Sequence, residues 1–373
     1  MNALQIVPIK TPRERLKFIH MPWSLYEGDP HWVPPIIADQ KAYLDPKRGV
    51  FFDHGEAELF LALRGGLAVG RVSAHVNDLY NQYHDEPKGF FGFFECENNQ
   101  ETAGALLRAV EQYHRGKGKK IVEGPLSFGI YDEVGVLVDG FDTDPYVLNV
   151  HNPPYYRELL EGAGFVKAID WYAYRGFTDG PVEEKLFRAR QRVLETPGFV
   201  LRNLDLKNVK REAAIVKGIF DTAWMENWGH VPLTEREYQR IVREMLKFAV
   251  PELSFIAEVE GQPVGFGLTV YDANVAVKKI NGRLFPFGFI VLLANLKRTD
   301  RARHILMGIR KEYRNRGIET AIYASIAEQA HALGFREIEM SLIVEDNLSM
   351  RQSLKHLPVT IYKTYRIFQK EIA

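Results

Sequence analysis

The chain has 373 residues, of which 46% are hydrophobic and 26% are charged, and this composition predicts a soluble globular protein of about two domains. Its 48 basic residues match its 48 acidic residues, which argues against a broad nucleic-acid-binding surface. The single cysteine, Cys96, excludes an intrachain disulfide and fits a reducing compartment. Residues 1–10 lack the features of a signal peptide, and the longest apolar run, residues 284–295, is shorter than the roughly 20 residues that span a bilayer. We therefore expect a cytoplasmic protein without a transmembrane segment.

The first half of the chain predicts three pieces of regular structure in order. Residues 61–70 contain an apolar run, a glycine turn and the start of a second run, which is the pattern of a β-hairpin. Residues 109–124 predict a helix, a turn at Gly118 and then a strand. Residues 160–174 predict the end of a helix followed by aromatic strand structure.

The second half repeats these three pieces in the same order, at residues 256–265, 325–340 and 354–368. Chance gives one such match, but three in order favour a duplicated fold. Each half also carries an insertion of its own, near residues 125–150 and 272–303.

The succession of elements predicts the fold class. We expect an α/β (α+β) protein made of two tandem domains, each with a mixed, largely antiparallel sheet flanked by helices. A turn-rich break at residues 178–181 precedes a charged helix at residues 182–195. The predicted domains are therefore residues 1–180 and residues 181–373.

The most informative local pattern is the turn at residues 309–319. It follows an apolar, strand-like run at residues 304–308 and opens a helix-like run at residues 320–333. The first N–H groups of a helix lack internal partners, and the helix dipole favours an anion there. Such a turn is typical of a phosphate site, although the same pattern also occurs in plain connections. The residues expected to hold a phosphate-bearing cofactor are Ile309, Arg314, Asn315, Arg316, Gly317, Ile318 and Thr320.

This turn resembles the acetyl-CoA-binding motif of the GNAT acyltransferases, in which Arg or Gln-x-x-Gly-x-Gly or Ala follows a strand. Ile309, Tyr313, Arg314 and Gly317 fit the motif, whereas Glu319 stands where the family has glycine or alanine. The resemblance implies that acyl-CoA or acetyl-CoA is the cosubstrate and that the second domain binds it.

The whole chain also resembles a group of bacterial proteins built as tandem GNAT-like domains. The first domain is expected to be degenerate, because its corresponding turn, residues 96–101, is acidic and lacks glycine. The segments that carry the resemblance are residues 29–35, 89–95, 123–125, 137–142, 152–156, 227–229, 345–347 and 365–367.

N-acyl transfer needs an unprotonated amine beside the thioester, and therefore a general base. Glu339 alternates with apolar residues on a strand, where a carboxylate is either functional or faces solvent. Glu345 and Asn347 lie where a strand gives way to a helix, so capping is the alternative role there. We expect the catalytic residues to be Glu339, Glu345 and Asn347. No His/Cys cluster or HExxH pattern suggests a metal site.

The resemblance implies an acyl-CoA-dependent N-acyltransferase of GNAT type, with a small-molecule or lipid amine as acceptor. The apolar run at residues 284–295 predicts either a greasy substrate site or peripheral contact with a membrane. One alternative is an aminoacyl-tRNA-dependent transferase, which also pairs GNAT-like domains, although a neutral chain is a poor partner for nucleic acid. The other is a non-catalytic binding protein on a decayed GNAT fold, favoured by Glu319 and by Leu354, where many GNAT enzymes have tyrosine.

Overall fold

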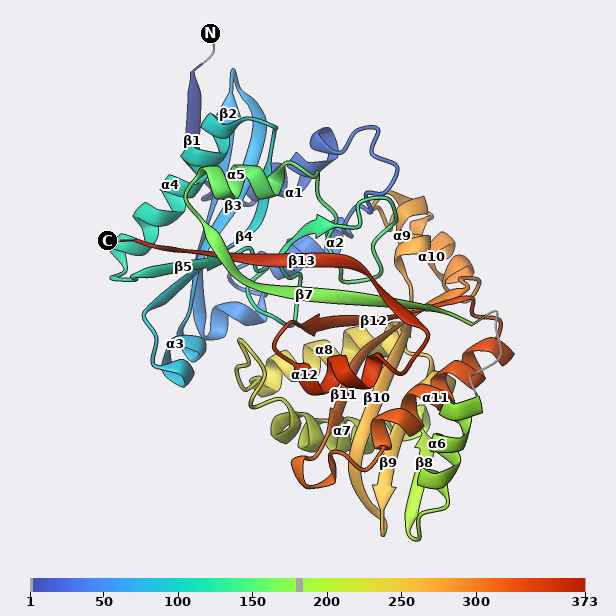
Figure 1. Ribbon diagram of the computed structural model, residues 1–373. Coiled ribbons are helices and arrows are strands. Elements are labelled where there is room, and N and C mark those ends of the chain that lie inside the picture. The colour runs from blue at the N-terminus through green and yellow to red at the C-terminus, as the bar shows by residue number, and fades with distance from the viewer. Residues whose placement is uncertain (1–2, 179–183, 373) are drawn as a thin grey trace. The chain divides into compact units, whose positions relative to one another are not determined.

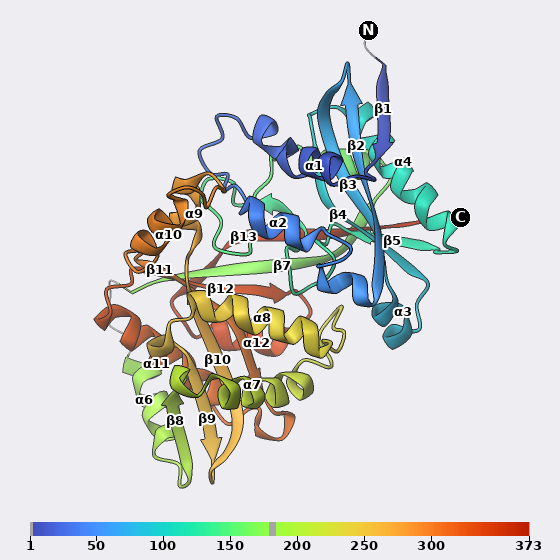
Figure 2. The same cartoon turned by 180° about the vertical axis from the view of Figure 1, so that it is seen from behind.

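The structure is a computed structural model that describes residues 3–178 and 184–372. The chain divides into two compact units, and it passes between them several times. The first unit contains residues 1–171, 277–292 and 363–373, and the second contains residues 172–276 and 293–362. Figures 1 and 2 show the elements from opposite sides.

The first unit is built on a mixed sheet with the strand order β1-β2-β3-β4-β5-β13, and β6 also pairs with β13. The pairing is antiparallel except between β4 and β5, which are parallel. The strands are β1 (Leu4–Pro8), β2 (Gly55–Arg64), β3 (Leu67–Asn77), β4 (Lys88–Cys96), β5 (Ile121–Gly124), β6 (Val136–Asp139), β7 (Val166–Phe177) and β13 (Val359–Glu371).

Helices cover both faces of this sheet. Successive side chains of a strand point to opposite faces, so apolar neighbours on one strand can pack against helices on either side. On β2, Phe60 packs in one core cluster with Leu106 of α4, and its neighbour Leu61 packs in another with Phe18 of α1. The helices of this unit are α1 (Pro12–Leu25), α2 (Ile37–Tyr43), α3 (Asp78–His84), α4 (Gln100–Gly116) and α5 (Tyr156–Gly162), with a 3₁₀ turn at Val50–Asp53.

The second unit has a sheet of the same kind. Its strands follow the order β7-β12-β11-β10-β9-β8, and β11 and β12 form a parallel pair. Its strands other than β7 are β8 (Phe199–Asn203), β9 (Phe255–Val259), β10 (Gln262–Tyr271), β11 (Arg301–Ile309) and β12 (Glu337–Val344).

Two glycines of β10 allow a helix to approach the second sheet closely. A Cβ atom at Gly265 or Gly267 would touch Ile318 or Ile322 of α11, so the missing side chains make room for that helix. Phe266 between them faces the other side, where α7 packs. The remaining helices are α6 (Glu184–Leu194), α7 (Val209–Ala223), α8 (Glu235–Phe248), α9 (Asn274–Ile280), α10 (Gly288–Leu296), α11 (Ile318–Ala332) and α12 (Leu348–Leu354), with 3₁₀ turns at Leu206–Asn208, Pro251–Leu253 and Lys311–Tyr313.

The structure confirms the predicted mixed α/β fold and its internal repeat. The succession β2-β3-β4-α4-β5 of the first unit matches β9-β10-β11-α11-β12 of the second, down to the parallel pair. The predicted boundary at residues 178–181 lies mostly outside the described residues. A division into residues 1–180 and 181–373 stays a prediction, while the compact units group residues 363–373 with the first unit.

Candidate functional site

The strand, turn and helix predicted around residues 309–320 are present in the second unit. β11 ends at Ile309, a 3₁₀ turn follows, and α11 begins at Ile318. Gly317 precedes the helix with a φ of 79°, and Asn315 has a φ of 61°. Glycine adopts such left-handed angles without strain, so the turn leads the chain directly from the strand into the helix.

The N-terminus of α11 has no side-chain cap, because its capping position is Gly317. The N–H groups of its first turn therefore keep their capacity to donate to an anion. The corresponding helix of the first unit, α4, is closed: Asn99 Oδ1 accepts from the N–H groups of Glu101 and Thr102 at 2.9 and 3.2 Å. One helix end is open to a ligand, and its counterpart is occupied by the protein.

The two arginines of the turn have different positions. Arg314 donates to the carbonyl oxygen of Ala223 at 2.8 Å and lies 3.6 Å from Glu226, so it fastens the turn to the end of α7. Arg316 is exposed, and its guanidinium lies 4.9 Å from the ring centre of Tyr313. Arg316 therefore presents its charge to solvent, whereas that of Arg314 is largely used within the protein.

β11 and β12 pair over only part of their length. The parallel register joins residues 301–304 with residues 337–340, although β11 continues to Ile309 and β12 to Val344. The other edge of β11 stays paired with β10 as far as Ile309. Beyond residue 304, the edge of β11 that faces β12 therefore lies outside the parallel pairing of these two strands. Figure 1 shows that β12 runs at a wide angle to β11.

Glu339, the first predicted catalytic residue, is fully buried on β12. Its carboxylate lies 3.4 Å from Arg303 Nε and accepts hydrogen bonds from the hydroxyl groups of Ser341 and Tyr362. A general base needs a lone pair that faces the substrate. In the structure, the carboxylate of Glu339 contacts Arg303, Ser341 and Tyr362 of the second unit. Its catalytic role stays a prediction.

The other two predicted catalytic residues lie at the start of α12. Asn347 is the N-cap of this helix, and its Oδ1 accepts from the N–H of Met350 at 3.1 Å. The backbone carbonyl of Glu345 accepts from Arg351 at 2.7 Å, and the residue is half-buried. Asn347 therefore has the helix-capping role that the sequence offered as the alternative to catalysis. Glu345 and Asn347 both lie at the start of α12.

The buried ion pair of β11 and β12 has a counterpart in the first unit. Glu123 of β5 occupies the position that matches Glu339 in the repeat, and Lys88 Nζ of β4 lies 3.1 Å from its carboxylate. Both carboxylates are at most 2% exposed. The cations differ in position, because Arg303 lies directly opposite Glu339, whereas Lys88 lies opposite Ile121, two residues before Glu123. In both repeats a buried carboxylate of one parallel strand still pairs with a cation of the other, so bridging these strands is one role of Glu339.

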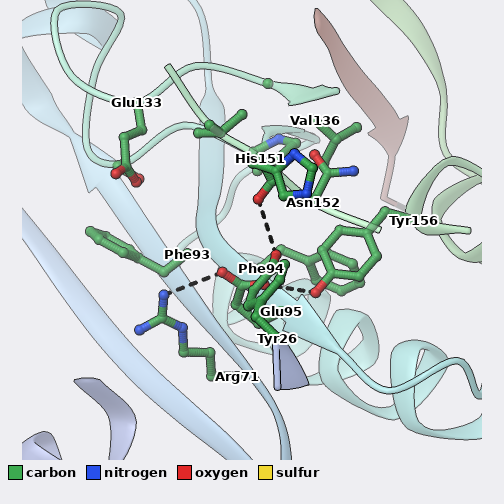
Figure 3. A pocket seen from close by; sticks show the side chains of 14 residues that line it. Tyr26, Arg71, Phe93, Phe94, Glu95, Glu133, Val136, His151, Asn152 and Tyr156 are labelled. Atoms are coloured by element: carbon green, nitrogen blue, oxygen red, sulfur yellow. Dashed lines mark hydrogen bonds and ion pairs between the residues drawn. The ribbon is translucent and has the colours of Figure 1, made fainter. Parts of the chain in front are cut away.

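A small pocket of the first unit contains further reactive side chains that the sequence analysis did not identify as a site (Figure 3). Tyr26 and Tyr156 each donate to Oε2 of Glu95 at 2.7 Å, and Arg71 lies 3.5 Å from Oε1. Burial raises the pKa of the Glu95 carboxyl, and Arg71 and the two hydroxyls oppose this shift. The feature of the sequence that could have indicated this pocket is Glu95, a carboxylate at the end of the aromatic run of residues 90–94.

Glu133 and His151 line the same pocket. Glu133 accepts from Ser127 Oγ at 3.2 Å, and desolvation raises the pKa of its carboxyl. His151 Nε2 lies 2.9 Å from Asp29 Oδ2, and burial lowers the pKa of the ring below its ordinary value. The ring thus faces the Asp29 carboxylate through Nε2, and its Nδ1 atom has no hydrogen-bond partner among the described residues.

Two general properties complete the description. In residues 3–178 and 184–372, no group of three or more His, Cys, Asp and Glu side chains could hold a metal ion. Among the helices of these same residues, none is both long and apolar enough to cross a bilayer.

The tandem repeat of mixed sheets, with an open helix end after the fourth strand of one repeat, is the architecture of a GNAT acyltransferase. Residues 215–356 match the family model described as acetyltransferase (GNAT) family. The bacterial ceramide synthase of Caulobacter vibrioides is 35% identical over 99% of this chain and 98% of its own length. Protein YghO of Escherichia coli is 32% identical over 95% of this chain and 92% of its own.

Solved structures show the same fold. A tandem GNAT protein from the clavulanic acid biosynthesis pathway superposes with a TM-score of 0.59 at 14% identity and covers 100% of this chain and 99% of its own. The chain belongs to the GNAT acyltransferase family, and it is an N-acyltransferase. The predicted family, fold and reaction class are confirmed.

Replacing Glu339 by glutamine removes the charge opposite Arg303 and keeps an acceptor oxygen for only one of the hydroxyl groups of Ser341 and Tyr362, because these donate to different carboxylate oxygens. We expect the apparent melting temperature of the full chain to fall, because removing one partner of a buried ion pair costs about 3–5 kcal/mol. Thermal unfolding followed by fluorescence measures this change. The double variant Glu339→Gln with Arg303→Met removes both charges and should regain most of the loss. An unchanged melting temperature in the single variant would contradict the bridging role.

Proposed function

We propose that this N-acyltransferase moves a long-chain acyl group from acyl-CoA to the amino group of a lipid, and that the second unit holds the acyl-CoA. One observation carries the assignment of the cosubstrate site: the N-terminus of α11 is open where β11 ends. The turn that forms this site consists of Ile309, Arg314, Asn315, Arg316, Gly317, Ile318 and Thr320.

The open helix end suits the pyrophosphate of CoA. The N–H groups of the first turn of α11 would donate to phosphate oxygens, and the helix dipole favours the negative charge. Gly317 supplies the positive φ of the turn and leaves room for Val193, and Arg316 adds an exposed cation. In the first unit the side chain of Asn99 occupies the equivalent donors, so we propose one CoA site per chain.

The edge of β11 beyond residue 304, which is not paired with β12 in the parallel register, suits the thioester of acyl-CoA. Backbone N–H groups of residues 305–309 on that edge would donate to the carbonyl oxygen and stabilise the oxyanion that forms as the amine attacks. A thiol with a pKa of about 8.5 leaves readily as an anion, so the leaving group needs no strong acid. The buried Leu354, in place of the family's tyrosine, is compatible with this chemistry.

The name of a relative supports a lipid amine as acceptor. A ceramide is an amide of a long-chain amino alcohol, and the bacterial ceramide synthase matches this chain over almost its whole length at 35% identity. We propose that the acceptor here belongs to the same chemical class, a long-chain primary amine with neighbouring hydroxyl groups.

An exposed apolar segment at residues 285–293 supports a greasy substrate. Phe285 is 86% exposed, Phe287 70% and Ile290 63%. Monomeric proteins rarely expose a contiguous patch of this kind without a binding role. We propose that this segment contacts the membrane surface from which the lipid amine is taken.

The reaction itself can be tested on the full chain with palmitoyl-CoA and a long-chain 2-amino-1,3-diol. We expect release of CoA thiol, measured with a thiol reagent, and formation of the N-acyl amide, identified by mass spectrometry. Acetyl-CoA should be a poorer donor, because each buried CH₂ group contributes about 0.8 kcal/mol. Octadecanol, which lacks an amine, is the control acceptor. Equal use of acetyl-CoA and palmitoyl-CoA, or no amide product, would contradict the proposal.

The phosphate site can be tested with the isosteric variants Gly317→Asp and Gly317→Asn. Both side chains tolerate the left-handed backbone comparably, and both place a Cβ atom 2.9 Å from Val193 Cγ2, so the two variants share this steric cost and differ mainly in one negative charge. A unit charge about 4 Å from a phosphate charge costs about 1 kcal/mol even in water. We therefore expect the aspartate variant to bind CoA at least about fivefold more weakly than the asparagine variant in calorimetry at low salt.

The same pair of substitutions at Gly334 provides a control. Gly334 has a φ of 81° and lies beyond the other end of α11, with no atom within 4 Å of an added Cβ. The two Gly334 variants should bind CoA equally. Equal CoA affinities for the two Gly317 variants would mean that phosphate does not bind at this helix end.

The membrane contact can be tested by replacing Phe285, Phe287 and Phe289 together with serine. We expect the triple variant to sediment with anionic phosphatidylglycerol vesicles at least about tenfold more weakly, because full burial of a phenylalanine contributes about 1.5–3 kcal/mol. Leu67→Ser removes a side chain that is 73% exposed elsewhere and should leave sedimentation unchanged. Equal sedimentation of the triple variant and the unaltered chain would rule out this segment as the contact.

A further inference from the structure

We propose that the first unit contains an anchoring site for the apolar segment, and that this site orients the exposed phenylalanines of the segment for contact with a membrane. The inference rests on the membrane contact proposed above and gives the first unit a part in it. Residues 277–292 are grouped with the first unit, so the segment and the site belong to one compact body. The site consists of Trp23, Pro30, Pro35, Ile37 and Asp144, which contact residues 278–282.

The exposed phenylalanines lie on an ordered backbone. The N–H of Phe289 donates to the carbonyl oxygen of Leu284 at 2.9 Å. Gly288 lets the loop fold back on itself, because a Cβ atom there would clash with the carbonyl oxygen of Arg283. The rings are therefore exposed although the backbone that carries them is hydrogen-bonded, and their exposure is a property of the fold.

A tight turn between α9 and the apolar segment fits against the first unit. Asn281 and Gly282 have φ angles of 47° and 70°. Asn281 Oδ1 accepts from Trp23 Nε1 at 2.8 Å, and the carbonyl oxygen of Gly282 accepts from the N–H of Ile37 at 3.0 Å. An added Cβ atom at Gly282 would clash with the carbonyl oxygen of Pro35, so glycine permits this close approach.

An ion pair fastens the end of α9 next to this turn. Lys278 Nζ donates to Asp144 Oδ2 at 2.5 Å and also to the carbonyl oxygen of Pro30. The other oxygen of Asp144 lies 2.8 Å from His31 Nδ1. Hydrogen bonds between charged groups are shorter and stronger than those between neutral groups. A lysine from the insertion of the second repeat is thus tied to two segments of the first repeat.

Both partners of Lys278 are held in place by further contacts. The N–H of His31 donates to Asp29 at 2.8 Å, which shapes the loop around Pro30. Lys363 of β13 is fully buried, and its Nζ donates to the carbonyl oxygen of Thr143 at 2.8 Å, directly before Asp144. The anchoring site is therefore a fixed part of the first unit.

The anchoring site gives a role to two stretches that carry the resemblance to tandem GNAT-like proteins. Residues 29–35 supply the carbonyl groups that face Lys278 and Gly282. Residues 137–142 lead to Asp144, and the carbonyl oxygen of Gly140 also accepts from the buried lysine of β13. Neither stretch belongs to the CoA site proposed for the second unit.

Anchoring has a thermodynamic consequence for binding to a membrane. A segment that is disordered before binding loses conformational entropy when it binds, and this loss opposes the gain from burying its apolar rings. The anchored segment is ordered before it meets the lipid, and Ile280 and Leu292 at its two ends are only 8% and 7% exposed. Asp144 and Lys278 are thus positioning residues for the phenylalanines, which would make the contact.

The variant Asp144→Ala tests the anchoring site in the full chain, because charge alone and anchoring predict effects of opposite sign. Removing a negative charge strengthens attraction to anionic vesicles if only charge matters. If Asp144 anchors the segment, we expect sedimentation with phosphatidylglycerol vesicles to become at least about fivefold weaker, because the released segment loses entropy on binding. Asp142 is exposed, so Asp142→Ala makes the same change in charge and should not weaken sedimentation.

Two substitutions of the partner residue extend the test. Lys278→Met should weaken sedimentation, and combining it with Asp144→Ala should add little, because both changes break one contact. Lys278→Arg keeps the ion pair and should retain most of the binding. Deuterium exchange at residues 284–291 should be faster in Asp144→Ala than in Asp142→Ala. The dissociation constant for CoA should stay unchanged in every variant, since the proposed CoA site lies in the second unit.

The outcomes separate the anchoring site from the membrane contact on which it rests. If the triple phenylalanine variant loses sedimentation but Asp144→Ala binds as well as the unaltered chain or better, the anchoring site is wrong and the membrane contact stands. A parallel loss of CoA affinity in Asp144→Ala and Lys278→Met would also overturn it, because these residues would then support the whole fold. If the unaltered chain does not sediment with vesicles, the membrane contact itself fails, and the anchoring role fails with it.

Discussion

A buried ion pair across two parallel strands occurs in each repeat, and it constrains how those two strands can align. Lys88 and Glu123 are 3.1 Å apart between β4 and β5, and Arg303 and Glu339 are 3.4 Å apart between β11 and β12. Such a pair contributes little net stability, because desolvation offsets the attraction of its charges. It does penalise any register that separates the partners, since an unpaired charge would then be buried. The pair therefore favours the register in which the two parallel strands of each repeat are observed.

The two repeats diverge at the next step along the chain, the start of the helix after the fourth strand. In the first repeat, Asn99 supplies an oxygen to the free N–H groups of α4 and closes that end. In the second, Gly317 supplies none and sets the backbone at a positive φ. The difference between an asparagine and a glycine at a capping position is about 1 kcal/mol or less in helix stability, but it decides whether the dipole end is available to a phosphate.

The sequence predicted the fold well because the signals concerned are local. Hairpin glycines, strand alternation and the helix start after residue 317 each depend on a few neighbouring residues, and the repeated order supplied the topology. Glu133 and His151 could not be predicted in the same way. Their chemistry arises from contacts with Ser127 and Asp29, of which the second is more than 100 positions away. Asn347 is different, because its capping role depends only on neighbouring residues, and the cap that the sequence suggested is observed.

N-acyl transfer makes two opposed electrostatic demands on a protein. The phosphates of CoA require donors and positive charge, which the open end of α11 and Arg316 would provide at the proposed site. An ammonium group requires acceptors and negative charge, and the first unit contains a pocket lined by two carboxylates, Glu95 and Glu133. A single small site that met both demands would weaken each, because opposite charges a few ångströms apart neutralise one another. A duplicated fold removes this conflict, since one copy can keep the helix end for phosphate while the other closes it and develops an acidic pocket. On this argument, the closed helix end of the first repeat is compatible with a role other than CoA binding and is not by itself a sign of decay.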